Sequence, residues 1–184
     1  MSDELVDELR RVLAEIDERA GSLPEPPDIF LVGAGTLVLE GISRRATQDL
    51  DFVADRAGDL FVNVVTEAGV HSHRVPAGLV SMARGWRDRA VPLAGFTARH
   101  ARFLVPALAD RLMDKLARGS ATDWQDIEAI VTSPACPEPE VVGHRAAEVL
   151  ADPPSSVFDP AVFRANFDRL AMLYGRAGRR APEL

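Results

Sequence analysis

The chain lacks the features that mark several large classes of protein. Its 184 residues include a single cysteine, Cys136, which excludes an intramolecular disulfide framework and suits a reducing compartment. No apolar run approaches the roughly 20 residues that a membrane-spanning helix needs. The first residues are acidic and amphipathic, unlike a secretory or transit signal. These absences predict a soluble, cytoplasmic protein with no membrane partner.

The charge balance also narrows the choice of partners. Lysine and arginine number 21 against 28 aspartates and glutamates, which leaves a formal charge of −7. Net acidity argues against sequence-independent coating of nucleic acid, although it leaves room for a local basic patch. Apolar residues make up 47% and charged residues 27%, which is ordinary for a globular protein and excludes disorder or a collagen-like repeat.

Hydrophobic periodicity predicts an α/β front half. The elements expected there are a helix over 2–20, a fully buried strand over 29–32, a short helix over 36–41, a strand of alternating polarity over 49–53 and a helix over 59–68. The stretch 71–105 reads as edge strands and loops, with short β-prone pieces at 90–93 and 101–105.

The back half is predicted to be helical. Helices are expected from 108 to a stop at Gly119, over 122–131, over 138–150 and over 160–174, followed by a basic, frayed tail over 176–184. We therefore expect an α/β (α+β) fold with a mixed sheet flanked by helices. Residues 1–105 would form the core with its N-terminal helix, and 106–184 a helical region packed on that core.

One stretch, from Phe30 to Asp55, carries chemistry. Asp49 and Asp51 lie two apart on a predicted strand, so their carboxylates project from the same face. Two such carboxylates repel each other unless a cation lies between them, and Mg²⁺ (or Mn²⁺) takes hard oxygen ligands while keeping positions open for phosphate and water. The small residues Gly33, Ala34 and Gly35 would let backbone N–H groups approach a triphosphate closely.

These residues resemble the minimal nucleotidyltransferase fold of the DNA polymerase β-like superfamily, whose hallmark is a glycine turn, a helix and an Asp-x-Asp strand. More narrowly, the chain is similar to the AbiEii/MenT-type toxin nucleotidyltransferases. The first shared feature is a hinge that contains arginine and threonine, here Arg44, Arg45 and Thr47. The second is a tryptophan and arginine between the motifs, here in 85–89. The third is a late Lys-Leu-x-Arg motif with Asp-x-x-Asp, here 115–118 with 123–126. The similarity covers about 29–131.

The resemblance implies roles for individual residues. Asp49 and Asp51 would hold the metal, Lys115 would contact the nucleoside triphosphate, and Asp123 would orient that lysine or the acceptor. The nucleotide-binding set would be Gly33, Ala34, Gly35, Arg44, Arg45, Thr47 and Lys115. Each residue also has an ordinary explanation: Lys115 as a surface lysine, Asp123 as a first-turn acid favourable to its helix, and Thr47 as a turn residue.

Two departures from the family pattern stand out. Where the family usually has a second glycine or serine in the turn, this chain has Ala34. The third carboxylate, which in the family completes the metal site from a neighbouring strand, is not identifiable. Asp88 and Asp123 are the candidates for it. His71 and His73 alternate on a β-prone stretch and would suit a transition metal, but no third ligand follows them closely.

These patterns predict a nucleotidyltransferase that moves a nucleoside monophosphate from a nucleoside triphosphate to an acceptor hydroxyl. By the resemblance, the acceptor would be a tRNA 3′ end, in a toxin–antitoxin or abortive-infection setting with an antitoxin partner. A small-molecule or protein hydroxyl is the other kind of acceptor. A non-catalytic nucleotide-binding or interaction protein with a decayed site is the alternative function.

Overall fold

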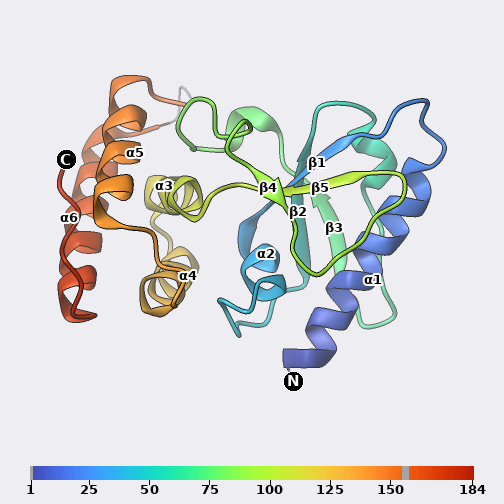
Figure 1. Ribbon diagram of the computed structural model, residues 1–184, viewed down its shortest axis with the longest axis horizontal. Coiled ribbons are helices and arrows are strands. Elements are labelled where there is room, and N and C mark those ends of the chain that lie inside the picture. Colours follow the sequence, from blue (N-terminus) through green and yellow to red (C-terminus); the bar gives the residue numbers. More distant parts are fainter. Residues whose placement is uncertain (1, 155–157) are drawn as a thin grey trace. The chain divides into compact units, whose positions relative to one another are not determined.

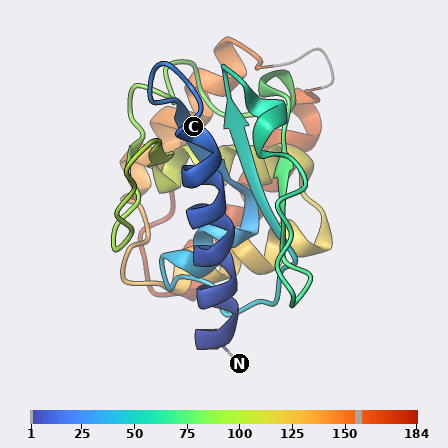
Figure 2. The ribbon, with the colours of Figure 1, turned by 90° about the vertical axis from the view of Figure 1, so that its right-hand side faces the viewer.

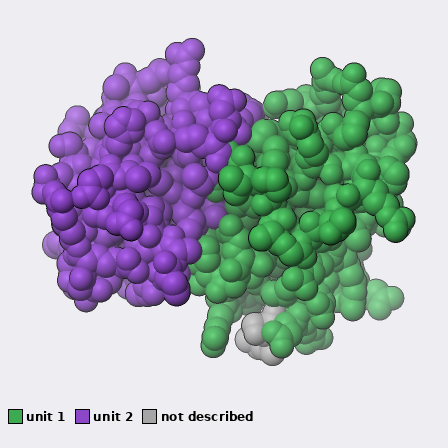
Figure 3. Space-filling view, viewed as in Figure 1, with its two compact units in different colours: residues 1–77, 90–106 green, residues 78–89, 107–184 purple. Residues whose placement is uncertain are grey.

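The computed structural model describes residues 2–154 and 158–184. Its elements, labelled in Figure 1, are α1 (Ser2–Ala20), β1 (Asp28–Val32), α2 (Gly33–Leu39), β2 (Asp49–Ala54), η1 (Gly58–Phe61), β3 (His71–Arg74), η2 (Ala77–Leu79), β4 (Val91–Pro92), β5 (Arg102–Val105), α3 (Leu108–Arg118), α4 (Ala121–Thr132), α5 (Pro139–Ala151) and α6 (Pro160–Arg176). They fall into two compact units, coloured in Figure 3: residues 1–77 with 90–106, and residues 78–89 with 107–184.

Unit 1 is built on a five-stranded mixed sheet in the order β3-β2-β1-β5-β4. Strand β1 is antiparallel to β2 and parallel to β5, and β2 is parallel to β3. Helix α1 runs across one face of the sheet (Figure 2), where its apolar stripe, Leu9 and Leu13 among it, joins Leu50 and Phe52 in the core. This architecture confirms the predicted α+β fold with a mixed sheet.

The polarity pattern of β2 decides which side chains leave the core. Leu50 and Phe52 are fully buried, whereas Asp49 and Asp51 alternate with them and retain exposure to solvent. After Asp28, strand β1 is apolar and its last four residues are buried, as the sequence of 29–32 predicts. The pairing of Val32 with Asp51 places the end of β1 beside the second aspartate.

Unit 2 consists of α3 to α6 together with the segment 78–89. Helix α3 is buried over most of its length and ends at Gly119, whose φ of 61° is the left-handed cap expected there. The segment 78–89 belongs to this unit because Arg89 forms two hydrogen bonds, of 3.0 and 2.7 Å, with the fully buried carboxylate of Asp110. Over 2–154 and 158–184, no helix is both long and apolar enough to cross a membrane.

Two predicted elements differ in the front half. The helix expected over 59–68 is only the 3₁₀ turn η1, after which the chain extends and Val65 bridges to His71. The β-branched residues of 62–66 favour this extended pairing over a helix. Strand β5 lies inside the sheet, between β1 and β4, and is not the edge strand that was predicted.

The C-terminal tail is anchored, so the prediction of a frayed tail is wrong. Arg179 donates hydrogen bonds of 3.1 and 3.0 Å to the carbonyl oxygens of Val131 and Ser133. Further along, the Glu183 carbonyl oxygen packs so closely on Gly143 of α5 that a Cβ there would overlap it. The tail's arginine therefore satisfies carbonyl groups at the end of α4.

Candidate active site

The two predicted metal-binding aspartates project from one face of β2. Their side chains are 50% and 28% exposed, for Asp49 and Asp51 respectively, opposite the buried face of Leu50 and Phe52. Alternate residues of a strand lie roughly 6–7 Å apart along it, so the two carboxylates lie close together on this face. The sequence prediction that they share a face is confirmed.

The glycine turn presses directly on this strand. Gly33 has a φ of 78°, and a Cβ at that position would overlap the Asp51 Oδ2 and lie 3.0 Å from its Cγ. A Cβ on Gly35 would lie 2.8 Å from the Asp49 carbonyl oxygen. Both positions require glycine because the backbone approaches β2 closely. The predicted turn is in fact the first turn of α2, which begins three residues earlier than expected.

Strand β3 adds two histidines that sequence reasoning did not connect with the aspartates. The parallel register pairs Asp49 with His71 and Asp51 with His73. His71 Nε2 lies 2.7 Å from Asp49 Oδ1, and His73 Nδ1 lies 3.2 Å from Asp51 Oδ1. The signal available in the sequence was a His-x-His pattern with the same period of two as Asp-x-Asp. What was missing was the pairing of the strands that bear them.

The hinge residues lie between α2 and β2 in unit 1. Arg44 is exposed and Arg45 half-buried, and the Thr47 hydroxyl lies 3.3 Å from both the backbone N–H and the carbonyl oxygen of Asp49. The threonine thereby fixes the start of β2. Arg44 and Thr47 also line a largely apolar cavity of about 230 Å³ at the N-terminal end of α1, together with Leu5 and Val70.

The other predicted residues belong to unit 2. Lys115, on α3, is buried and its Nζ donates a 2.7 Å hydrogen bond to Asp126, with Asp123 at 4.0 Å. Lys115 is therefore not the surface lysine of its ordinary explanation. The partner Asp126 is buried as well, so the ammonium group already has a carboxylate counter-charge within its own unit.

Asp123 has a structural task at the start of α4. Ser120 and Asp123 form a reciprocal capping box, and Arg118 donates a 2.8 Å hydrogen bond to the same carboxylate. Burial alone would raise the pKa of Asp123, but the hydrogen bonds from Arg118 and Ser120 outweigh burial and lower it. Burial would likewise lower the pKa of Arg118, but Asp114 and Asp123 outweigh it and raise the pKa.

The donor set in unit 1 fits a divalent cation that is shared with phosphate. Two carboxylates are the protein contribution that Mg²⁺ takes when substrate phosphates and water complete its shell. Across the part of the chain that the structure describes, no group of three His, Cys, Asp or Glu side chains forms a ready-made metal site. Asp88, a candidate third carboxylate, is exposed and lies in unit 2.

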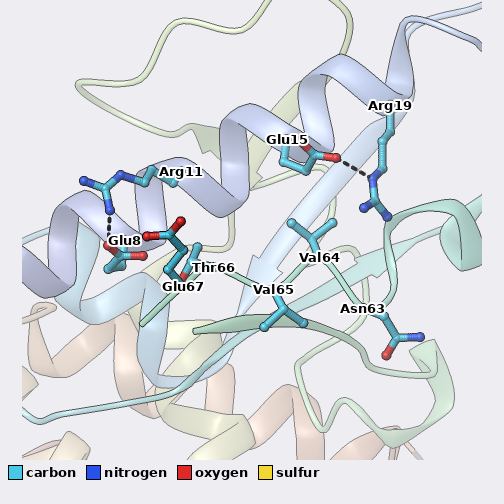
Figure 4. Close-up of a pocket in the computed structure, with 9 residues that line it drawn as sticks. All are labelled: Glu8, Arg11, Glu15, Arg19, Asn63, Val64, Val65, Thr66 and Glu67. Atoms are coloured by element: carbon cyan, nitrogen blue, oxygen red, sulfur yellow. Dashed lines mark hydrogen bonds and ion pairs between the residues drawn. The ribbon is translucent and has the colours of Figure 1, made fainter. Parts of the chain in front are cut away.

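A second concavity lies away from the carboxylate face. A cavity of about 710 Å³ lies between the polar face of α1 and the extended segment 63–67, and Figure 4 shows the residues that line it. Its helix side carries Glu8, Arg11, Glu15 and Arg19, which pair as Glu8 with Arg11 and Glu15 with Arg19. Because the charges on that side neutralise one another, they do not favour a ligand of either sign.

Comparison with known proteins identifies a family for the chain. No curated protein and no solved structure was found to match the chain. A family model described as "Nucleotidyltransferase of unknown function (DUF6036)" matches residues 7–139, which include the glycine turn, both aspartates, both histidines and Lys115. The match covers well over half of the 184 residues. The chain therefore belongs to this DUF6036 family of nucleotidyltransferases.

Proposed function

We propose that this protein transfers a nucleoside monophosphate from a nucleoside triphosphate to an acceptor hydroxyl. The observation that supports this most directly is the contact of Gly33 with the carboxylate of Asp51. It places backbone without side chains beside a pair of carboxylates, which is the combination that a triphosphate with its cation requires. Gly33, Ala34 and Gly35 would contact the phosphates, and Asp49 and Asp51 would hold Mg²⁺ or Mn²⁺.

The chemistry is a substitution at the α-phosphorus. The acceptor oxygen forms a bond to that phosphorus, the bond to the oxygen bridging the α and β phosphates breaks, and pyrophosphate leaves with the electron pair. The acceptor hydroxyl loses its proton to water or to a nearby base. A divalent cation, when bound, supplies charge neutralisation for the phosphates. Arg44 and Arg45 would add cationic donors from the hinge.

The finer assignments rest on the resemblance described above. We include in the proposal an RNA acceptor, a tRNA 3′ end first, and a toxin role controlled by an antitoxin protein in the cytoplasm, where nucleoside triphosphates are available. Lys115 and Asp123 remain in the proposed catalytic set, although Lys115 would have to share its ammonium group between Asp126 and a phosphate.

The test is direct. The full chain is incubated with Mg²⁺ or Mn²⁺, total RNA and each of the four nucleoside triphosphates, labelled at the α-phosphate. We expect label in the RNA and one pyrophosphate released per label incorporated. The double variant Asp49→Asn/Asp51→Asn should lose at least a hundredfold of this rate, because both oxygen-donor charges are gone. Asp7→Asn, the same change on an exposed face of α1, is the control.

Equal labelling by the wild type and the double variant would overturn the proposal. Label that appears in protein or in a small molecule instead of RNA would change the acceptor but keep the reaction.

A non-catalytic nucleotide-binding protein is the second candidate, favoured by the ion pair that already occupies Lys115. Thermal unfolding with a nucleoside triphosphate separates the two functions. At a ligand concentration of about 100 times Kd, binding stabilises the fold by roughly 2.7 kcal/mol. Stabilisation together with labelled product indicates the enzyme. Stabilisation without product under any condition indicates the binding protein, and no stabilisation contradicts both.

A further inference from the structure

Strand β3, the neighbour of β2 in the sheet, carries two histidines that are paired in register with the two aspartates. Strands β2 and β3 are parallel, and paired residues of adjacent strands project from the same face, so His71 and His73 lie on the face of Asp49 and Asp51. The four side chains form two adjacent pairs, each with a nitrogen and an oxygen within 2.7 to 3.2 Å. All four retain exposure to solvent, so an ion has access to them.

The nitrogen–oxygen distance within each pair matches the distance between two ligand atoms that bind the same metal ion. Metal–ligand bonds of about 2.1 Å at a right angle leave the two donor atoms roughly 3 Å apart. Each pair therefore offers two donors to a cation with little movement. Neither pair is a complete site by itself, consistent with the absence of a ready-made three-ligand group among the described residues. Positions are left for phosphate oxygens and water.

The donor types discriminate between metals. Mg²⁺ strongly prefers oxygen and is held mainly by carboxylates, phosphates and water. Imidazole nitrogen suits first-row transition metals, and carboxylate suits Mn²⁺ as well as Mg²⁺. We propose that Asp49 with His71, and Asp51 with His73, form mixed carboxylate–imidazole pairs that, with phosphate and water completing the shell, select Mn²⁺ over Mg²⁺. The use of that ion in nucleotidyl transfer rests on the function proposed above, whereas its binding does not.

A purely structural role for the histidines makes a different prediction. In that role they hydrogen-bond the aspartates and join β3 to β2, and no imidazole nitrogen meets a metal. The variant His71→Gln/His73→Asn distinguishes the two roles, because the amide nitrogen of glutamine replaces Nε2 and that of asparagine replaces Nδ1. Both amides keep a hydrogen-bond donor to the carboxylate, but they are much poorer ligands for a transition metal.

The experiment measures metal binding without any reaction. Free Mn²⁺ is followed by electron paramagnetic resonance as the full-length protein is titrated, and Mg²⁺ is added as competitor. For the double histidine variant we expect the Kd for Mn²⁺ to rise at least tenfold, while the Kd for Mg²⁺ changes less than about threefold. His144→Gln, on the exposed face of α5, is the matched control and should change neither value.

Circular dichroism and thermal unfolding establish that each variant is folded, and the single variants His71→Gln and His73→Asn replace the double variant if it does not fold. Parallel changes in the two Kd values, or none, would overturn the inference. So would a wild-type protein that does not bind Mn²⁺.

Failure of the inference and failure of the proposed function look different. Histidine-dependent binding of Mn²⁺ with no labelled product from any nucleoside triphosphate would sink the transfer reaction and keep the metal site. Suppose instead that the wild type and the double histidine variant form labelled product in Mg²⁺ at equal rates and bind Mn²⁺ equally well. That result would contradict the metal site and keep the transfer reaction.

Discussion

At the scale of single residues, Gly33 is the most constrained position of the candidate site. We predict that Gly33→Ala loses about 1–2 kcal/mol of folding free energy through its left-handed φ and also displaces the Asp51 carboxylate. Gly41→Ala is a matched control, because Gly41 has a φ of 70° and its Cβ would meet no described atom within 4 Å. Urea unfolding should show a loss for both variants, the larger one for Gly33→Ala because its Cβ also overlaps Asp51, but only Gly33→Ala should lose transfer activity, by at least tenfold.

If both alanine variants lost activity equally, strain alone would explain the effect and the contact with Asp51 would carry no function.

A second residue-scale prediction concerns Asp17, which the sequence did not single out. Its buried carboxylate accepts hydrogen bonds of 2.8, 2.8 and 2.9 Å from the backbone N–H groups of Arg99, His100 and Ala101. Asp17→Ala should cost roughly 3 kcal/mol, because these groups lose a charged acceptor. Hydrogen exchange should become faster at 99–105. The exposed neighbour Glu18→Ala should leave both measurements unchanged.

At the scale of elements, the capping box of α4 makes stability depend on pH. The folded state lowers the pKa of Asp123 below its ordinary value, so its contribution to stability is complete above the unfolded pKa of about 3.9. That contribution is lost as the pH falls through the folded pKa. Asp123→Asn should therefore be less stable than the wild type at pH 7, with a difference that shrinks below about pH 4.

Chemical denaturation at pH 7, 5 and 3 measures this difference. Glu128→Gln, on an exposed position of the same helix, should show no such narrowing. A gap that stayed constant down to pH 3 would contradict the assignment of the shift to Asp123.

The elements also show which parts of the fold local sequence could predict. Helices α3 to α6 were predicted within a few residues, because their caps and apolar stripes are local signals: Gly119 ends α3, and Pro139 and Pro160 begin α5 and α6. The helix expected over 59–68 was not confirmed, because the pairing of Val65 with His71 overrides its apolar spacing. The interior place of β5 depends on pairing with β1, which is distant in sequence.

At the scale of the whole molecule, the chain enters the second unit twice. The segment 78–89 is tied to α3 by Arg89 and Asp110, and Arg145 of α5 lies 3.8 Å from the same carboxylate. The hydrogen bond with Asp110 raises the pKa of Arg89, so the guanidinium stays charged. Asp110→Ala should destabilise unit 2 by about 3–5 kcal/mol, because it leaves two arginines without their buried partner.

This prediction is tested by hydrogen exchange, measured separately for each peptide of the chain. Protection should fall in 78–89 and 107–151 and persist in the strands of unit 1. The exposed pair of Arg84 and Asp152 is the control, since Arg84→Gln should change stability by less than about 1 kcal/mol. Uniform loss of protection along both units would show that the chain unfolds as one body.

The amino-acid sequence by itself determined the local features of this protein. The shared face of Asp49 and Asp51 follows from the period of a strand. The need for glycine at 33 and 35, in contrast, follows from the close approach of that backbone to β2. Only the tertiary structure decided that His71 and His73 stand beside those aspartates and that Lys115 is paired with Asp126. The physical reason is that strand register and burial are set by partners distant in sequence, and no local periodicity encodes them.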